Sequence, residues 1–181
     1  MQLFSLTNEI KNQKISNTAE LLSKIFLELK QRSLNPSLAG LSSGFYDLDS
    51  FTQGFQKSDL IVIAGRPSMG KTAFCLNISL NVIKKFKLPV LFFSLEMSAE
   101  QLASRILSEV AKIPSNQIRR GDFTESEFRR IVDAAKELEA APLFIDDTPA
   151  LPISQLAARA RRLKRTHGLD ALFVDYLQLV R

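Results

Sequence analysis

Cysteine, tryptophan and long apolar runs are scarce or absent in this sequence, and each absence excludes a class of protein. The single cysteine, Cys75, excludes an internal disulfide and a cysteine-rich metal site, so a reducing compartment is expected. No apolar run reaches membrane-spanning length, so we expect no transmembrane helix and no membrane partner. The first residues, MQLFSLTNEIKNQK, lack the long apolar core of a secretory signal and are not rich in Arg and Ser, as a transit peptide would be.

The composition is that of a globular protein with a core of its own. The chain has 181 residues, of which 45% are hydrophobic and 24% charged. A net charge of +5 is compatible with a phosphate-bearing partner but does not demand one. The absence of targeting signals fits a bacterial cytoplasm. The lead-in, rich in Lys, Asn and Ile, also suits an AT-rich organelle genome, so the plastid stroma is the other expected location.

The composition along the chain predicts three regions. Residues 1–16 are a polar lead-in with little order. Residues 17–33 read as a helix whose apolar residues fall on one face: Leu21, Leu22, Ile25, Phe26 and Leu29. This helix either packs on its own domain or docks on a neighbouring subunit, and the pattern does not choose between them. Residues 34–181 form the main domain.

Apolar strands and helices alternate regularly through the main domain. Buried strands are predicted at residues 59–65, 89–96, 142–147 and 169–180. Helices are predicted at residues 71–86, 98–112, 124–141 and 154–168. Capping residues mark the helix ends: Ser98 with Gln101, Thr124 with Glu127, Ser154 and Gly168. Short apolar strands that alternate with helices predict an α/β fold, with a parallel sheet covered on both faces.

A glycine-rich motif lies between the first predicted strand and the helix that follows it. The pattern G-x-x-x-x-G-K-[ST] is met in full by Gly65, Arg66, Pro67, Ser68, Met69, Gly70, Lys71 and Thr72. Its backbone N–H groups and the helix N-terminus suit phosphate oxygens. Lys71 would reach the β and γ phosphates, and Thr72 would offer its hydroxyl to Mg²⁺. The alternative, a tight turn without a ligand, has no use for Lys-Thr here, so the motif predicts a bound nucleotide with Mg²⁺, and the family resemblance described below implies that the nucleotide is ATP.

Two acids at the carboxyl ends of predicted strands suit the same chemistry. Asp175 ends the apolar run ALFVD, at the sheet edge where ligands collect, and is the candidate Mg²⁺-shell carboxylate. The alternative is a buried Asp bonded to backbone N–H groups. Glu96, in FFSLEMS, could orient the attacking water. Its alternative is a solvated acid near a helix N-terminus.

Other charged groups have plainer interpretations. Asp146 and Asp147, before Thr-Pro, read as a turn-forming pair that could also touch the ligand edge. Basic residues cluster in two places, which read as solvated faces or, less simply, as contacts to DNA or another subunit. They are Arg159, Arg161, Arg162, Lys164 and Arg165 in one cluster, and Arg119, Arg120, Arg129 and Arg130 in the other.

Several motifs occurring together and in order resemble the motor domain of bacterial-type replicative DNA helicases, the DnaB family. The motifs are GLSSGFYDLDSFTQGFQKSDLIVIAGRPSMGKTAF, FFSLEMSAEQLASRIL and LAARARRLKRTHG ahead of ALFVDYLQLV. The resemblance runs from about Leu21 to the end. It implies a RecA-like P-loop ATPase core, a ring hexamer that encircles single-stranded DNA, and unwinding of the duplex at the replication fork by ATP hydrolysis.

By the same resemblance, specific residues take specific roles. Lys71 and Thr72 are the phosphate and Mg²⁺ residues, Glu96 the catalytic glutamate and Asp175 the metal-shell aspartate. The helix at 17–33 resembles the family's linker helix, which favours packing on an adjacent subunit. Contact with primase or a helicase loader is open, because the family's N-terminal helical domain has no counterpart in the short polar lead-in.

The resemblance also implies that the family's DNA-binding loops, further strands and arginine finger lie beyond Arg181. One of those strands inserts between the Asp175 strand and the phosphate-loop strand. We therefore expect an incomplete motor with a gap in its sheet: a truncated gene, a piece of a split or interrupted gene, or a deliberate fragment. One alternative is a nucleotide-binding interaction protein that does not unwind DNA. Another is a different RecA-like ATPase, such as a recombinase or a clock-type ATPase, but the motifs SLEMS and VDYLQL argue against it.

Overall fold

The structure, a computed structural model, describes residues 17–34 and 40–180 and divides the chain into two units, Met1–Ala39 and Gly40–Arg181. In the first unit, α1 (Thr18–Leu34) confirms the predicted helix. The residues of its apolar face are exposed: Leu21, Leu22, Ile25, Phe26 and Leu29. What this face binds therefore stays a prediction. The predicted lead-in, residues 1–16, lies outside the described residues.

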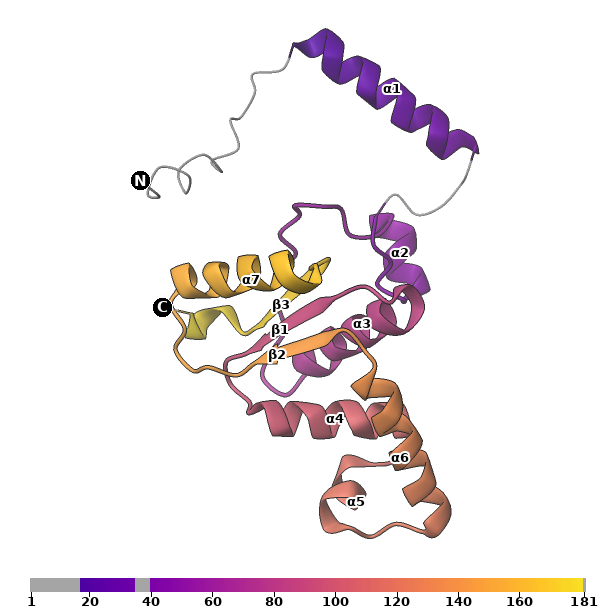
Figure 1. The fold of residues 1–181 in the computed structure, drawn as a ribbon, viewed down its shortest axis with the longest axis vertical. Helices are drawn as coiled ribbons and strands as arrows, with labels where there is room; N and C mark the ends of the chain where they lie inside the picture. The colour runs from indigo at the N-terminus through magenta and orange to yellow at the C-terminus, as the bar shows by residue number, and fades with distance from the viewer. Residues whose placement is uncertain (1–16, 35–39, 181) are drawn as a thin grey trace. The chain divides into compact units, whose positions relative to one another are not determined.

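The second unit is built on a parallel sheet (Figure 1). Over the described residues this sheet has three strands in the order β2-β1-β3. The central strand, β1 (Val90–Ser94), pairs with β2 (Leu143–Asp146) and with β3 (Ala171–Asp175). Helices α3 (Lys71–Phe86) and α4 (Ala99–Ala111) cover one face, and α7 (Ile153–His167) covers the other. The predicted α/β class, with a parallel sheet flanked by helices, is confirmed.

The core follows from the alternation of side chains along β1. Phe92 points toward α3 and α4, where it packs with Leu76, Leu80, Leu102 and Ile106. Leu91 and Phe93 point the other way, toward Leu151 and Leu156 at the α7 side. Both phenylalanines are fully buried, and each contributes roughly 2–3 kcal/mol through removal of apolar surface from water. All five positions of the strand are buried, and the four from Val90 to Phe93 are apolar, because both of its faces are covered.

The predicted strand at residues 59–65 is wrong. This segment is not a strand and makes no ladder with any described residue. Leu60 is 90% exposed and Val62 73% exposed. β3 pairs with β1 and, among the described strands, with nothing on its other edge. An apolar run becomes a strand only when a partner satisfies its backbone groups, and here no described segment supplies one. The expected gap in the sheet, to be filled by a further strand, stays a prediction.

Some of the helix ends predicted from the sequence are confirmed by the structure, and one is wrong. Ser98 caps α4 by accepting from the Gln101 amide, although Gln101 returns no side-chain bond within the described structure. Gly168 ends α7 at φ 80°, as predicted. The Ser154 cap is wrong, because α7 begins one residue earlier, after Pro152, whose carbonyl accepts from Leu156 N. Pro152 makes no side-chain cap bond, and its carbonyl accepts from Gln155 N as well as from Leu156 N.

Two other segments are shorter or more broken than predicted. The strand expected at residues 169–180 ends at Asp175 and continues as a 3₁₀ turn, η1 (Leu177–Leu179). The stretch between α4 and β2 adds a short helix, α5 (Ser115–Arg120), before α6 (Glu125–Glu139). Here Pro114 stops α4 from continuing, and Gly121 adopts φ 71° to end α5.

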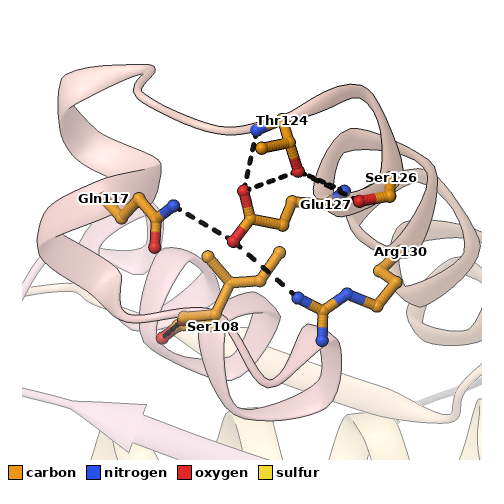
Figure 2. Close-up of polar contacts among 7 residues, drawn as sticks. Ser108, Gln117, Thr124, Ser126, Glu127 and Arg130 are labelled. Atoms are coloured by element: carbon orange, nitrogen blue, oxygen red, sulfur yellow. Dashed lines mark hydrogen bonds and ion pairs between the residues drawn. The ribbon is translucent and has the colours of Figure 1, made fainter.

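The corner between α5 and α6 is organised by Glu127 (Figure 2). Its carboxylate accepts from the Thr124 amide at 2.7 Å and from Gln117 Nε2 at 3.2 Å. Thr124 Oγ1 in turn accepts from the Glu127 amide, which confirms the predicted capping box. The bonds from Thr124 come first among the causes that hold the pKa of Glu127 below its ordinary value. The corner is therefore specified by local polar contacts beside the small apolar cluster of α4 and α6.

A buried carboxylate organises the segment ahead of the phosphate loop, in α2 (Tyr46–Thr52). Asp49, only 7% exposed, accepts from Ser42 Oγ at 2.6 Å and from Ser43 N and Oγ at 2.8 and 2.7 Å. Asn81 of α3 donates to the Ser43 carbonyl at 3.0 Å. A Cβ on Gly44 would lie 2.3 Å from the Asn81 amide nitrogen, so only glycine fits there. These contacts attach the segment to the helix that follows the phosphate loop.

In the part of the chain that the structure describes, no helix combines the length and the apolar character needed to cross a membrane.

Candidate functional site

The glycine-rich motif forms an open loop between the unpaired 59–65 segment and α3. Gly70 adopts φ 85° and caps α3 without a side-chain bond, so no side chain of this cap occupies the first amides of the helix. Ser68 also lies in the left-handed region, at φ 63°. Beside the loop is a hollow of about 460 Å³ lined by Ile63, Ala64, Gly65, Arg66, Met69, Gly70, Lys71 and Phe74. Curled backbone and a helix N-terminus with uncapped amides form an arrangement suited to phosphate oxygens.

Lys71 is the first residue of α3, and its side chain folds back over the loop. Its Nζ donates to the Gly65 carbonyl at 3.2 Å and lies 5.8 Å from the centre of the Tyr176 ring. The ammonium group is thus held above the loop by one hydrogen bond and one aromatic face. Sequence reasoning missed Tyr176, although it directly follows the candidate Asp175. A lysine held this weakly is free to move to an anion that enters the loop.

Thr72 and Asp175, far apart in the sequence, meet at the carboxyl edge of the sheet. Thr72 Oγ1 donates to Asp175 Oδ2 at 2.6 Å. Asp175 ends β3 and is 7% exposed. Among the described residues, the Asp175 carboxylate bonds to this hydroxyl rather than to a backbone N–H group, which differs from the alternative of a buried Asp bonded to backbone. A hydroxyl and a carboxylate beside a phosphate-type loop are oxygen ligands of the kind that Mg²⁺ accepts.

Glu96 lies in the loop that follows β1, next to the end of β3. Its side chain is exposed. The backbone around it is well held, because Leu95 N donates to the Asp175 carbonyl at 2.8 Å and buried Ser94 donates to the Met97 carbonyl at 2.7 Å. The backbone on either side of Glu96 is therefore held by hydrogen bonds, while its carboxylate is accessible from solvent. This placement suits a group that acts on an incoming ligand, and it also suits a solvated acid.

The predicted pair Asp146 and Asp147 divides into two roles. Asp146 forms the expected turn by accepting from Thr148 N, and it binds Arg159 at 2.7 Å. Burial alone would raise the pKa of Asp146, but the bonds from Arg159 and Thr148 lower it overall. Asp147 instead accepts from Ala99 N at 2.8 Å, at the start of α4. Sequence reasoning missed this contact because it joins two segments far apart in the chain.

The basic clusters lie on exposed helix surfaces. Three of these cations form ion pairs within the chain. Arg159 pairs with Asp146, and Arg129 pairs with Glu125. Arg130 lies 4.0 Å from the Glu127 carboxylate. The remaining cations make no ion pair with any described residue: Arg119, Arg120, Arg161, Arg162, Lys164 and Arg165. His167 is exposed beside the Phe144 ring. Solvated helix faces remain the simplest interpretation of both clusters.

Cys75 lies in α3, half-buried against the core. Burial, with a smaller effect from the negative charge of Asp175, raises the pKa of its thiol to about 11. At pH 8 only about one thiol in a thousand is then ionised, against roughly one in four for an ordinary cysteine. We expect iodoacetamide to modify Cys75 about 100-fold more slowly in the folded chain than in urea, measured by mass spectrometry. Equal rates in the two states would contradict a buried thiol.

Comparison with known proteins places this site in a family. The family model described as the DnaB-like helicase C terminal domain matches residues 40–181. The chain belongs to this family. The matched range includes the phosphate loop, the Glu96 loop and Asp175. The resemblance predicted from the sequence motifs is confirmed.

Relatives of the DnaB-like family match along nearly the whole chain. The probable replicative DNA helicase of Trieres chinensis is 57% identical over 182 residues, covering 99% of this chain and 40% of that protein. The replicative DNA helicase DnaB of Nostoc sp. is 44% identical over 181 residues, covering 99% of this chain and 21% of that protein. This chain therefore spans less than half the length of these two relatives.

Solved structures of DnaB-like proteins share the fold. The ATPase domain of G40P superposes with a TM-score of 0.84 at 29% identity, covering 92% of this chain and 59% of that one. A DnaB-like replicative helicase, studied with its interactions with primase, gives a TM-score of 0.80 at 29% identity, covering 92% of this chain and 40% of that one. The predicted ATPase-type fold is thereby confirmed.

Proposed function

We propose that this chain forms part of the motor of an ATP-dependent replicative DNA helicase, which couples ATP hydrolysis to unwinding of duplex DNA at a replication fork. The observation that carries the proposal is the 2.6 Å contact between Thr72 of the phosphate loop and Asp175 of β3. It brings together a hydroxyl and a carboxylate that can share a cation, within the range that matches the DnaB-like helicase family.

The residues present fit Mg-ATP. The loop from Gly65 to Thr72 offers backbone amides and the positive end of α3 to the phosphates. Lys71 can leave its weak contact with Gly65 to neutralise the β and γ phosphates. Thr72 and Asp175 supply oxygens to the metal side. Bound Mg-ATP supplies the phosphoanhydride bond and the charge that polarises it.

Glu96 takes the role of the group that orients or deprotonates the attacking water. Its carboxylate is exposed, while its loop is tied to the Asp175 carbonyl through Leu95 N. A base must be held within hydrogen-bond reach of the proton that it removes, and a loop held by hydrogen bonds at the ligand edge can place it there. Glu96 follows β1, and Asp175 ends the neighbouring strand β3. In this proposal Glu96 is the acid–base group and Asp175 is the carboxylate of the metal shell.

The partners of the proposed motor are single-stranded or forked DNA and further copies of the same protein in a ring hexamer. Primase and a helicase loader are further candidates. The support is family membership, together with a solved DnaB-like neighbour described with its primase interactions. We place the protein in a bacterial cytoplasm or a plastid stroma, in keeping with relatives from bacteria such as Nostoc and from Trieres chinensis.

One observation favours a second candidate, a nucleotide-binding protein that joins a partner without unwinding DNA. The apolar segment that leads into the phosphate loop is exposed at Leu60 and Val62 and has no partner strand among the described residues. Such a segment is suited to pairing with another polypeptide.

DNA-stimulated hydrolysis separates the two candidates. We expect Mg-ATP to raise the thermal midpoint of the chain, because a ligand that binds only the folded state stabilises it. We further expect single-stranded DNA to increase ATP hydrolysis by the protein in its full natural length, and forked DNA to be unwound. A midpoint shift without DNA-stimulated hydrolysis would favour the interaction protein, and no shift at all would contradict both.

A further inference from the structure

The loop that carries Glu96 is held by contacts from two other strand ends. From the β3 side, the Asp175 carbonyl accepts from Leu95 N at 2.8 Å. From the β2 side, Asp147 Oδ2 accepts from Ala99 N at 2.8 Å, across 48 residues of sequence. Within the loop, Ser94 Oγ donates to the Met97 carbonyl at 2.7 Å. Glu96 thus lies between two anchored ends, at Leu95 and Ala99.

The Asp147 contact is more than a routine helix cap. Helix α4 already has a capping side chain, Ser98, whose Oγ accepts from the Gln101 amide at 3.3 Å. Asp147 binds a different amide, and it reaches that amide from another strand. A charged acceptor on a backbone N–H at a helix start is a strong and well-directed hydrogen bond. Its position fixes where the loop after β1 passes into α4.

The neighbouring aspartate shows that this role belongs to Asp147. Asp146 is occupied by Arg159 and by the Thr148 amide, so it ties β2 to α7 and to its own turn. Asp147 forms no ion pair with any residue that the structure describes, and its carboxylate accepts a hydrogen bond from Ala99 N. Two adjacent carboxylates at one strand end therefore hold opposite sides of the sheet.

We propose that Asp147 is a positioning residue for ATP hydrolysis, holding the loop that presents Glu96 through its hydrogen bond to Ala99. This inference rests on the proposed function, because it assigns Glu96 to the reacting water. Asp147 itself touches no reacting atom. Loss of its bond frees the α4 side of the loop, while the phosphate loop, Lys71 and the Thr72–Asp175 pair keep their contacts.

The test compares Asp147→Ala, Asp147→Asn and Asp146→Ala in the protein at its full natural length. We expect Asp147→Ala to lower kcat for ATP hydrolysis by about 10-fold with KM for ATP within about twofold, because small misplacements of a reacting group are costly. Asp147→Asn keeps a side-chain oxygen that can accept from Ala99, so it should recover most of kcat. Asp146→Ala should lower the thermal midpoint, but it should not lower kcat selectively while KM stays unchanged.

Hydrogen exchange supplies a readout that does not depend on catalysis. The Ala99 amide should exchange about 10-fold faster in Asp147→Ala than in the parent, and near the parental rate in Asp147→Asn. The inference is overturned if Asp147→Ala keeps the parental kcat, if kcat and KM change together, or if Asp146→Ala reproduces its kcat loss. A parent that binds no Mg-ATP and hydrolyses none would overturn the proposed function instead, and the positioning role with it.

Discussion

Lys71→Ala is expected to remove most of the stabilisation that Mg-ATP gives to the folded chain. A charged hydrogen bond to phosphate contributes about 1.5–3 kcal/mol, so the affinity should fall by roughly 10- to 150-fold. At a nucleotide concentration near 100 times the parental Kd, binding stabilises the parent by about 2.7 kcal/mol. A 100-fold weaker variant retains only about 0.4 kcal/mol under the same conditions. Differential scanning fluorimetry with and without Mg-ATP measures this difference.

The variant should fold as well as the parent when no nucleotide is present. Lys71 is tied to the protein by its bond to Gly65 and its position over the Tyr176 ring, and both contacts are weak. Lys85→Ala is the matched control, because Lys85 lies in the last turn of the same helix and is exposed. It should keep the full response to Mg-ATP. An equal midpoint shift in Lys71→Ala and in the parent would contradict a phosphate role for Lys71.

Asp49→Ala is expected to destabilise the chain by roughly 3 kcal/mol, because it leaves buried donors without their charged acceptor. Asp49 binds Ser42 Oγ and both the amide and the hydroxyl of Ser43. These bonds hold the segment that Asn81 attaches to α3. Chemical denaturation followed by circular dichroism measures the loss.

Asp47→Ala is the control for this prediction. Asp47 lies in the same short helix but is exposed, so its removal should change the free energy of unfolding by about 0.5 kcal/mol or less. Similar losses in the two variants would show that the buried network carries no special stability.

The Asp49 network also predicts a dependence of stability on pH. Burial alone would raise the pKa of Asp49, but the bonds from Ser42, Ser43 and Gly44 lower it overall. A carboxyl with a lowered folded pKa stabilises the protein above its unfolded pKa of about 3.9, and this stability is lost as the pH falls through the folded value. Asp49→Asn should therefore flatten the loss of stability below about pH 4 relative to the parent.

Much of the molecule follows from local sequence patterns. Thr124 and Glu127 specify the start of α6, because both partners of the capping box lie within one turn. The phosphate loop is recognisable because glycine, lysine and threonine at that spacing suit one ligand chemistry. The position of Asp175 at the end of β3 follows from the apolar run that precedes it, since ligand-facing acids lie at strand carboxyl ends.

Other features were decided only by the tertiary structure. Residues 59–65 have the composition of a buried strand, yet Leu60 is 90% exposed because a strand also needs a neighbour to pair with. Asp147 reads locally as part of a turn, and only the parallel packing of β2 beside β1 brings its carboxylate to Ala99. The sequence by itself therefore determined the longer helices, the caps at Ser98 and Thr124 and the nucleotide motif, since these depend on nearby residues, whereas it did not reveal the short helices α2 and α5. The folded structure decided which strands pair and which carboxylates meet a partner, because those contacts join segments far apart in the chain.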